Sequence, residues 1–361
     1  GGVGLLRHDE DHEGLQFGRL ALDFSGPLTE SLRSQLTIVA ADVGDDNVFD
    51  VTDAFIEWRP YPRSSWSWRT KVGAFYPPVS LENRGVGWQS LYSLSPSAIN
   101  TWIGEEVRAV GMEVKATNAG AALQRPFDFS VIAGVYGWND PMGVLLFRRG
   151  WAIHDHEVPL FGQLPRPLPR ATDDPSIEFS HEIDDRPGYY SGIESKWYGK
   201  HVLRVLHYDN RGDPAQKNRA DSAWLSRFDA VGARIELPAN FTVIAQWLDG
   251  DTAVGRSEDG RGKLIADYWS CFVLGSYSPG RHRITLRYDR MYVESTRGAQ
   301  FFDSAQDAHA WTAAYLYSHD EHWLIGIETL RLDGSLRQRR RIGLPAAAVE
   351  QQLQLAVRYS F

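Results

Sequence analysis

The last ten residues, Gln352-Leu-Gln-Leu-Ala-Val-Arg-Tyr-Ser-Phe361, decide the fold class. Apolar side chains occupy every second position, at Leu353, Leu355, Val357, Tyr359 and Phe361. Successive side chains of a β-strand point to opposite faces, so this spacing predicts a strand with one apolar and one polar face.

The same alternation recurs from one end of the chain to the other, at residues 19–24, 51–59, 68–75 and 283–289. Each run is about ten residues long, the length of a tilted strand that crosses a bilayer, whereas strands of soluble sheets average about five or six residues. Many apolar faces end in Trp or Tyr, as in the aromatic girdles of membrane barrels. The pattern favours an all-β, transmembrane antiparallel β-barrel over a soluble β protein.

Composition excludes several other classes of protein. The single cysteine, Cys271, rules out a disulfide framework and a zinc site built from cysteines. A net charge of −8 argues against a protein that coats nucleic acid. The mean hydropathy of −0.36 excludes a bundle of membrane helices.

Connection lengths predict the organisation of the barrel. Short links alternate with longer, polar segments, as periplasmic turns alternate with outer loops, and this places the C-terminus in the periplasm. We expect one domain over residues 1–361, with Gly1–Arg7 as a shortened first strand, an inward constriction loop at 78–104 and a long outer excursion at 138–188. The count is then 16 strands, or 18 if Met142–Arg149 and Ser176–Asp184 also cross the membrane.

Two stretches carry a resemblance to a known family. Val51-Thr-Asp-Ala-Phe-Ile-Glu-Trp-Arg59 and Lys71-Val-Gly-Ala-Phe-Tyr-Pro-Pro-Val-Ser-Leu-Glu-Asn83 resemble the phosphate-selective porin O/P-like outer-membrane proteins. The ending at Tyr359 and Phe361 is similar to the signal that the outer-membrane assembly machinery reads. The resemblance implies a homotrimeric, 16-stranded passive channel in a Gram-negative outer membrane.

The chain departs from that family where phosphate would be selected. Phosphate-selective members carry lysines in the inward loop and an arginine ladder on the wall. Here Pro77–Gly104 has Arg84 as its only basic residue, and Glu105 and Glu106 follow at once. The resemblance therefore predicts a porin without establishing phosphate selectivity.

The inward loop is the first candidate site, because it is too long and too apolar to float in solvent. Ser95-Pro96 predicts an N-cap and first helical residue, starting a short helix through Trp102 that narrows the lumen. In the alternative, the loop does not narrow the lumen and only supports the barrel wall or packs at a contact between subunits. The predicted constriction residues are Arg84, Trp88, Tyr92, Trp102, Glu105 and Glu106.

The polar faces of the strands predict the lining of the pore. Both signs of charge occur there, and a small excess of arginine favours anions, although most of these charges also have neighbours with which to pair. The predicted basic lining residues are Arg19, Arg69, Lys71, Arg283, Arg287 and Arg358.

Other constellations carry weaker hypotheses. His8–Glu13, His154–Glu157 and His319–His322 mix histidines and carboxylates, but predicted loops ordinarily leave such groups solvated, so we expect no metal. Arg337–Arg341 fits lipopolysaccharide phosphates or, equally, the acidic segment Asp9–Glu13. Gly-x-Ser-x-Gly and His-Glu-x-x-His are absent, so we expect neither an enzyme nor a cofactor.

The sequence thus supports three functional hypotheses. The first is an outer-membrane porin for passive diffusion of small hydrophilic solutes, with a weak preference for anions. The second is a specific channel for an oligosaccharide or organic acid, with an aromatic track at Trp88, Tyr92 and Trp102. The third is a structural or adhesive barrel plugged by the excursion at 138–188.

Overall fold

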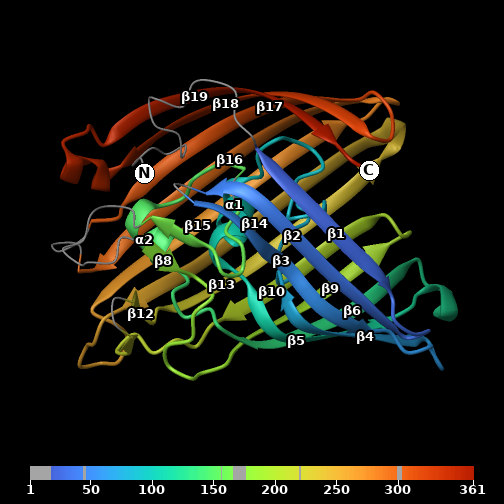
Figure 1. Ribbon diagram of the computed structural model, residues 1–361, viewed down its shortest axis with the longest axis horizontal. Coiled ribbons are helices and arrows are strands. Elements are labelled where there is room, and N and C mark those ends of the chain that lie inside the picture. The colour runs from blue at the N-terminus through green and yellow to red at the C-terminus, as the bar shows by residue number, and fades with distance from the viewer. Residues whose placement is uncertain (1–17, 44–45, 156, 166–175, 219–220, 299–302) are drawn as a thin grey trace.

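The computed structural model describes residues 18–43, 46–155, 157–165, 176–218, 221–298 and 303–361. Figure 1 shows one large antiparallel sheet that curves around an interior holding two short helices. Fifteen strands make up this sheet, in the order β1-β2-β3-β4-β5-β6-β9-β10-β13-β14-β15-β16-β17-β18-β19. Each strand therefore pairs with its neighbours along the chain.

The strands of the large sheet have the following bounds: β1 (Arg19–Pro27), β2 (Leu32–Val43), β3 (Asp46–Trp58), β4 (Trp66–Phe75), β5 (Ala109–Asn118), β6 (Phe127–Gly137), β9 (Gly188–Trp197), β10 (His201–Asp209), β13 (Leu225–Leu237), β14 (Phe241–Val254), β15 (Leu264–Tyr277), β16 (His282–Arg297), β17 (Gln306–Ser318), β18 (Trp323–Leu336) and β19 (Ala347–Tyr359). Two small hairpins pair β7 (Gln163–Pro165) with β8 (Ser176–Glu178) and β11 (Lys217–Asn218) with β12 (Asp221–Ser222). The α-helices are α1 (Ala98–Glu106) and α2 (Val144–Arg149).

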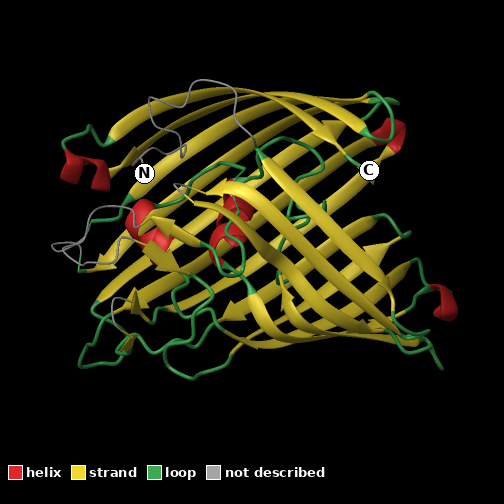
Figure 2. Cartoon of the chain, viewed as in Figure 1, coloured by secondary structure: helices red, strands yellow, loops and turns green. Residues whose placement is uncertain are grey.

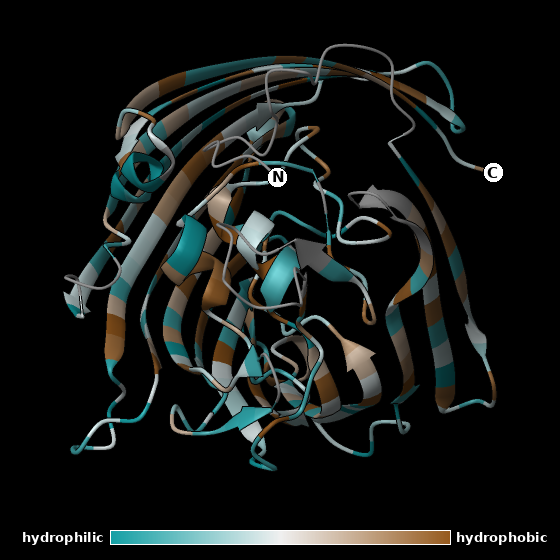
Figure 3. Cartoon of the chain, turned by 60° about the vertical axis from the view of Figure 1, so that its left-hand side comes forward, coloured by the Kyte–Doolittle hydropathy of each residue, from teal (hydrophilic) through white to brown (hydrophobic). Residues whose placement is uncertain are grey.

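Side chains alternate in exposure along the strands, as the sequence predicts. Leu353 of β19 is 74% exposed and Leu355 is 72% exposed, while Gln352 and Gln354, which alternate with them, are half-buried. Figure 3 shows the resulting alternation of hydrophilic and hydrophobic residues along single strands. An exposed apolar outer face is what a barrel presents to lipid, so the expected all-β transmembrane barrel is confirmed.

The two ends of the barrel differ in the length of their connections. Short turns such as Pro238–Asn240 lie at the end on the right of Figure 1, where the C-terminus also lies; we call it the short-turn end. Long connections, such as that between β18 and β19, lie at the opposite end, which we call the loop end. This arrangement matches the alternation expected from the sequence.

The extra pair of strands that the alternative of 18 requires does not appear among the described residues. Val144–Arg149 forms α2, and Ser176–Glu178 is a strand of three residues that pairs with β7. β6 instead pairs directly with β9, so residues 138–187 form a single excursion. The predicted first strand, Gly1–Arg7, lies outside the described residues, and the strand count is not otherwise tested.

Both helices lie within the curve of the sheet. Figure 2 shows α1 and α2 inside it, whereas the other helical turns lie at strand ends. Every residue of α1 is buried, and so is nearly all of α2. No helix of the described chain is long and apolar enough to cross a membrane. The interior is therefore occupied by the segments β4–β5 and β6–β9, and these position the candidate site.

The lipid-facing pattern predicts a large difference between two adjacent positions of β19. Leu353, the central residue of this strand, points outward, so Leu353→Arg is expected to destabilise the inserted barrel by about 2–4 kcal/mol. Gln352→Arg faces the interior and is expected to cost much less. The free energy of unfolding is measured by urea titration of the protein in lipid vesicles. Equal decreases for the two variants would contradict the assignment of the two faces.

Candidate functional site: the lumen and its inward segments

The β4–β5 connection runs along the inner wall of the barrel. Gln246 of β14 binds it twice: its Oε1 accepts from the Leu81 amide at 2.9 Å, and its Nε2 donates to the Val79 carbonyl at 3.0 Å. Arg204 of β10 donates to the carbonyls of Pro78, at 2.7 Å, and Ser80, at 3.2 Å. Side chains of the wall thus hold the main chain of the loop.

Helix α1 begins later than the sequence predicts. Its N-cap is Ser97, whose Oγ accepts from the Asn100 amide, and the helix runs to Glu106. Ser95 does not cap the helix because both its amide and its hydroxyl donate to Glu328 of β18. A carboxylate more than two hundred residues away therefore moves the helix start, which local sequence could not show.

The tip of the loop reaches the opposite wall. Arg19 of β1 donates to the Gly87 carbonyl at 3.0 Å. Trp88 stacks on Tyr76 at 4.1 Å between ring centroids, and its Nε1 donates to the Asn100 carbonyl at 2.8 Å. Arg84 is exposed. The loop thus crosses the interior of the barrel from β14 to β1.

The excursion between β6 and β9 also enters the barrel and braces α1. Arg149 makes a buried two-pronged ion pair with Glu105, at 2.6 and 3.0 Å, and His154 Nε2 lies 3.1 Å from the same carboxylate. Burial alone would raise the pKa of Glu105, but Arg149 and His154 outweigh it and hold the pKa well below its usual value. Glu105 is therefore an ionised anchor inside the barrel.

Glu106 is held by neutral donors instead of charges. Its carboxylate accepts from the amide of Leu145 at 2.8 Å, from the amide of Gly143 at 3.2 Å, and from the indole of Trp102. These bonds connect the end of α1 to the start of α2. The two adjacent acids thus join the two inward segments to one another.

Aromatic rings close the space around α1. Trp102 contacts Trp151, Phe228 and Tyr268, each at 5.5 Å between ring centroids and in edge-on geometry. Because Trp102 is 1% exposed, it offers no ring face to a sugar. The aromatic track expected from the sequence therefore cannot use Trp102.

One stretch of wall, from β3 to β10, carries closely packed charges of both signs. Arg69 lies 3.4 Å from Glu57 and 3.5 Å from Glu113. Glu194 pairs with Lys115 at 2.5 Å and with Arg204 at 2.5 Å. The side chains of Arg69 and Lys71 are 32% and 18% exposed, but those of Glu57 and Glu113 only 6% and 2%. Water in the lumen therefore meets the basic groups, with the carboxylates beneath them.

The predicted site residues fall into three environments. Exposed to solvent are Arg84, Tyr359 and Phe361. Partly exposed are Arg19, Arg69, Lys71, Trp88, Arg283 and Arg358. Buried are Tyr92, Trp102, Glu105, Glu106 and Arg287. The last group packs against protein, and the inward segments cause its burial.

The sequence clusters of histidine and acid serve other contacts. His154 pairs with Glu105, and Glu157 pairs with Arg19. His8–Glu13 lies outside the described residues. In the basic run, Arg337 donates to Asp303 at 3.2 Å and Arg339 to Glu350 at 2.9 Å.

A group of three carboxylates at the loop end escaped the sequence analysis. Asp140, Glu182 and Asp184 place ligand atoms within 4.8 Å of one another. Burial, together with the charges of Asp184 and Glu182, raises the pKa of Asp140 to about 7. More than forty positions of the sequence separate Asp140 from Glu182 and Asp184, so no local motif could indicate the group.

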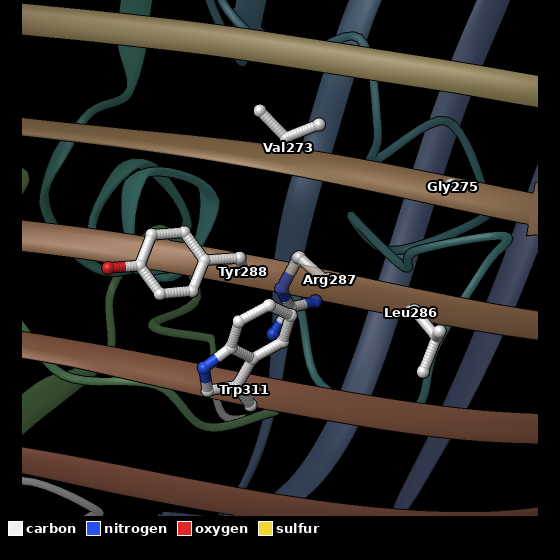
Figure 4. A pocket seen from close by; sticks show the side chains of 6 residues that line it. All are labelled: Val273, Gly275, Leu286, Arg287, Tyr288 and Trp311. Atoms are coloured by element: carbon white, nitrogen blue, oxygen red, sulfur yellow. The ribbon is translucent and has the colours of Figure 1, made fainter.

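An apolar groove of about 360 Å³ lies on the outer face rather than in the lumen. Figure 4 shows the residues that line it, which are Val273, Gly275, Leu286, Arg287, Tyr288 and Trp311. Val273, Leu286 and Trp311 are all more than half exposed on the lipid-facing side. The groove therefore belongs to the lipid-facing surface of the barrel.

Solved structures show what this arrangement resembles. The outer membrane channel DcaP of Acinetobacter baumannii has a TM-score of 0.56 at 13% identity, over 95% of this chain and 84% of that chain. This chain has the fold of an outer-membrane β-barrel. The trimer form of OmpT, an outer membrane protein of Vibrio cholerae, has a TM-score of 0.53 at 12% identity, over 97% and 94% of the two chains.

A third structure with the porin fold is an anion-selective porin from Comamonas acidovorans, with a TM-score of 0.50 at 13% identity, over 95% and 89% of the two chains. No protein-family model and no curated protein matches the sequence. The coarser part of the expected resemblance, an outer-membrane porin barrel, is thus confirmed for the fold.

The buried pair of Glu105 and Arg149 predicts a strong penalty for breaking one side only. Arg149→Met leaves a buried carboxylate with less compensation and is expected to cost about 3–5 kcal/mol. The double variant Arg149→Met/Glu105→Gln is expected to recover part of that loss. As a control, Arg186→Gln removes an exposed pair with Asp213 and is expected to cost under about 1 kcal/mol. The free energy of unfolding is measured in urea for each single variant and for the double variant. A decrease in the double variant equal to the sum of the two single decreases would contradict the pairing.

The raised pKa of Asp140 predicts a pH dependence of stability. Between the ordinary value of 3.8 and about 7, the folded chain holds a proton that the unfolded chain releases. Stability is therefore expected to fall as pH rises through this window. Asp140→Asn is expected to flatten that dependence in thermal unfolding at pH 5 and pH 8. If the variant and the parent lose the same stability, Asp140 is not the titrating group.

Proposed function

We propose that this protein is an outer-membrane porin for passive diffusion of small hydrophilic solutes, with a weak preference for anions. The observation that carries the proposal is the layered charge of the wall, where Arg69 and Lys71 face the lumen and Glu57 and Glu113 lie beneath. A guanidinium near the water-filled path attracts carboxylate and phosphate oxygens. The anion-selective porin with the same fold adds support.

Solutes enter at the loop end, pass the part of the interior that the inward loop narrows, and leave down their gradient. No catalytic step, cofactor or energy input is part of this proposal. We infer a homotrimer, which the trimer form of the Vibrio cholerae OmpT supports. The exposed Tyr359 and Phe361 would present the assembly signal, and Arg340 and Arg341 of the basic run would meet lipopolysaccharide phosphates.

A second function is favoured by one observation, the depth to which the excursion enters the barrel. Trp151, Ile153 and Val158 are almost fully buried. A barrel sealed by this segment would be structural or adhesive. Conductance that is negligible in the intact chain and rises when residues 138–187 are deleted would favour this reading over the open porin.

Single-channel recording across a planar bilayer tests the proposal. In a salt gradient, the reversal potential is expected to lie closer to the equilibrium potential of the anion than to that of the cation. Arg69→Gln is expected to move it toward the cation side, because Glu57 and Glu113 are then uncovered. Arg331→Gln removes the same charge from the outer face and is expected to leave selectivity unchanged. A cation-selective parent channel would overturn the anion preference.

A further inference from the structure

Arg287 of β16 lies in the barrel interior but contacts no water. Its side chain is fully buried, unlike that of Arg283, which lies on the same strand and the same face and is partly exposed. An arginine in such a place must have its charge and its donors satisfied by protein, because an uncompensated buried charge costs several kcal/mol. The identity of its partners therefore shows its role.

The guanidinium of Arg287 binds the wall and the loop at once. Its Nε donates to Asp289 at 2.7 Å and its Nη2 to Thr312 at 3.2 Å, both on the wall. Its Nη1 meets the loop, at Glu82 (3.1 Å), the Ser93 hydroxyl (3.2 Å) and the Ser95 carbonyl (2.8 Å). The planar fork thus joins β16 and β17 to both arms of the loop.

Glu82 and Asp289 extend this connection to the start of α1. The second carboxylate oxygen of Glu82 accepts from the Ser97 amide at 3.0 Å and from the Asn100 side chain at 2.8 Å. The second oxygen of Asp289 accepts from the Ala98 amide at 3.1 Å. Both acids therefore satisfy groups at the N-terminus of α1, where the helix dipole favours negative charge.

Glu328 of β18 holds the adjacent turn. It accepts from the amides of Leu94 at 2.8 Å and Ser95 at 3.1 Å. Together with Gln246 and Arg204, the buried polar groups form a row around the wall from β10 to β18. Within that row Arg287 contacts both Glu82 and Ser95, and so reinforces the direct hydrogen bonds that Ser90 and Ser93 donate to Glu82. It ties both arms of the loop to β16, and this bears on the width of the loop as well as its place.

We propose that Arg287 is the positioning residue that sets the size limit of the pore, by clamping the inward loop to the wall through Glu82 and Asp289. The inference rests on the proposed channel function. It assigns Arg287 to loop placement rather than to the lining predicted from the sequence. Lysine cannot replace it, because one ammonium group cannot reach carboxylates in two directions and the Ser95 carbonyl together.

Two measurements on refolded protein test the proposal. In single-channel recording, Arg287→Met is expected to raise conductance about twofold and to admit larger polyethylene glycols, because the constriction widens. In hydrogen exchange read by mass spectrometry, peptides covering residues 81–98 are expected to exchange faster, while peptides from β19 do not change. Arg287→Lys is expected to show both effects in part.

The matched control is Arg283→Gln, four positions earlier on the same face. Arg283 donates to the Ser276 hydroxyl at 3.1 Å and reaches the loop through one contact, over the ring of Tyr92. We expect Arg283→Gln to change ion selectivity, to leave the polymer size limit unchanged and to speed exchange in residues 81–98 much less than Arg287→Met does. If Arg287→Met does not fold, Glu328→Gln keeps an oxygen for Ser95 but weakens the same anchor, and is expected to give smaller shifts in the same direction.

The outcomes separate the two proposals. An Arg287→Met channel with unchanged conductance, size limit and exchange overturns the role of Arg287. A parent protein that does not conduct overturns the proposed channel, while faster exchange in the variant would still show that Arg287 anchors the loop. Faster exchange with an unchanged size limit would show an anchor that does not set pore size, and would also overturn the inference.

Discussion

The structure depends on one constraint: in a membrane, the backbone groups of a strand find hydrogen-bond partners only on neighbouring strands. In the described residues the large sheet pairs its strands in chain order from β1 to β19, and the alternation of side chains then separates a lipid face from an interior. Because the lipid face takes the apolar residues, the interior receives the charges. Their arrangement there decides what the barrel can do.

Inside, the charges have two different environments. The side chains of Arg69 and Lys71 remain partly exposed on the wall, above the buried Glu57 and Glu113. Arg287 and Arg149 are sealed by protein and hold the inward segments to the wall and to α1. Residues of the same type thus lie in different environments, and burial by the inward segments separates them.

The sequence predicted the fold and the general form of the site. Alternation at Leu353 and Leu355 identified the lipid face, and the apolar content of residues 78–104 indicated a loop that folds inward. Prediction was poorer for individual residues. Ser97 rather than Ser95 caps α1, because Glu328 binds Ser95. Asp140 meets Glu182 and Asp184 only through the fold of the long excursion.

The sequence by itself determined which face of each strand is apolar, since the period of two is a local property of the chain. Only the tertiary structure decided which inward residues meet water. Arg283 and Arg287 have the same residue type, strand and face, yet one is partly exposed and the other fully buried. The difference arises because Glu82 and Ser95, about two hundred residues earlier, cover Arg287 when the loop packs against β16.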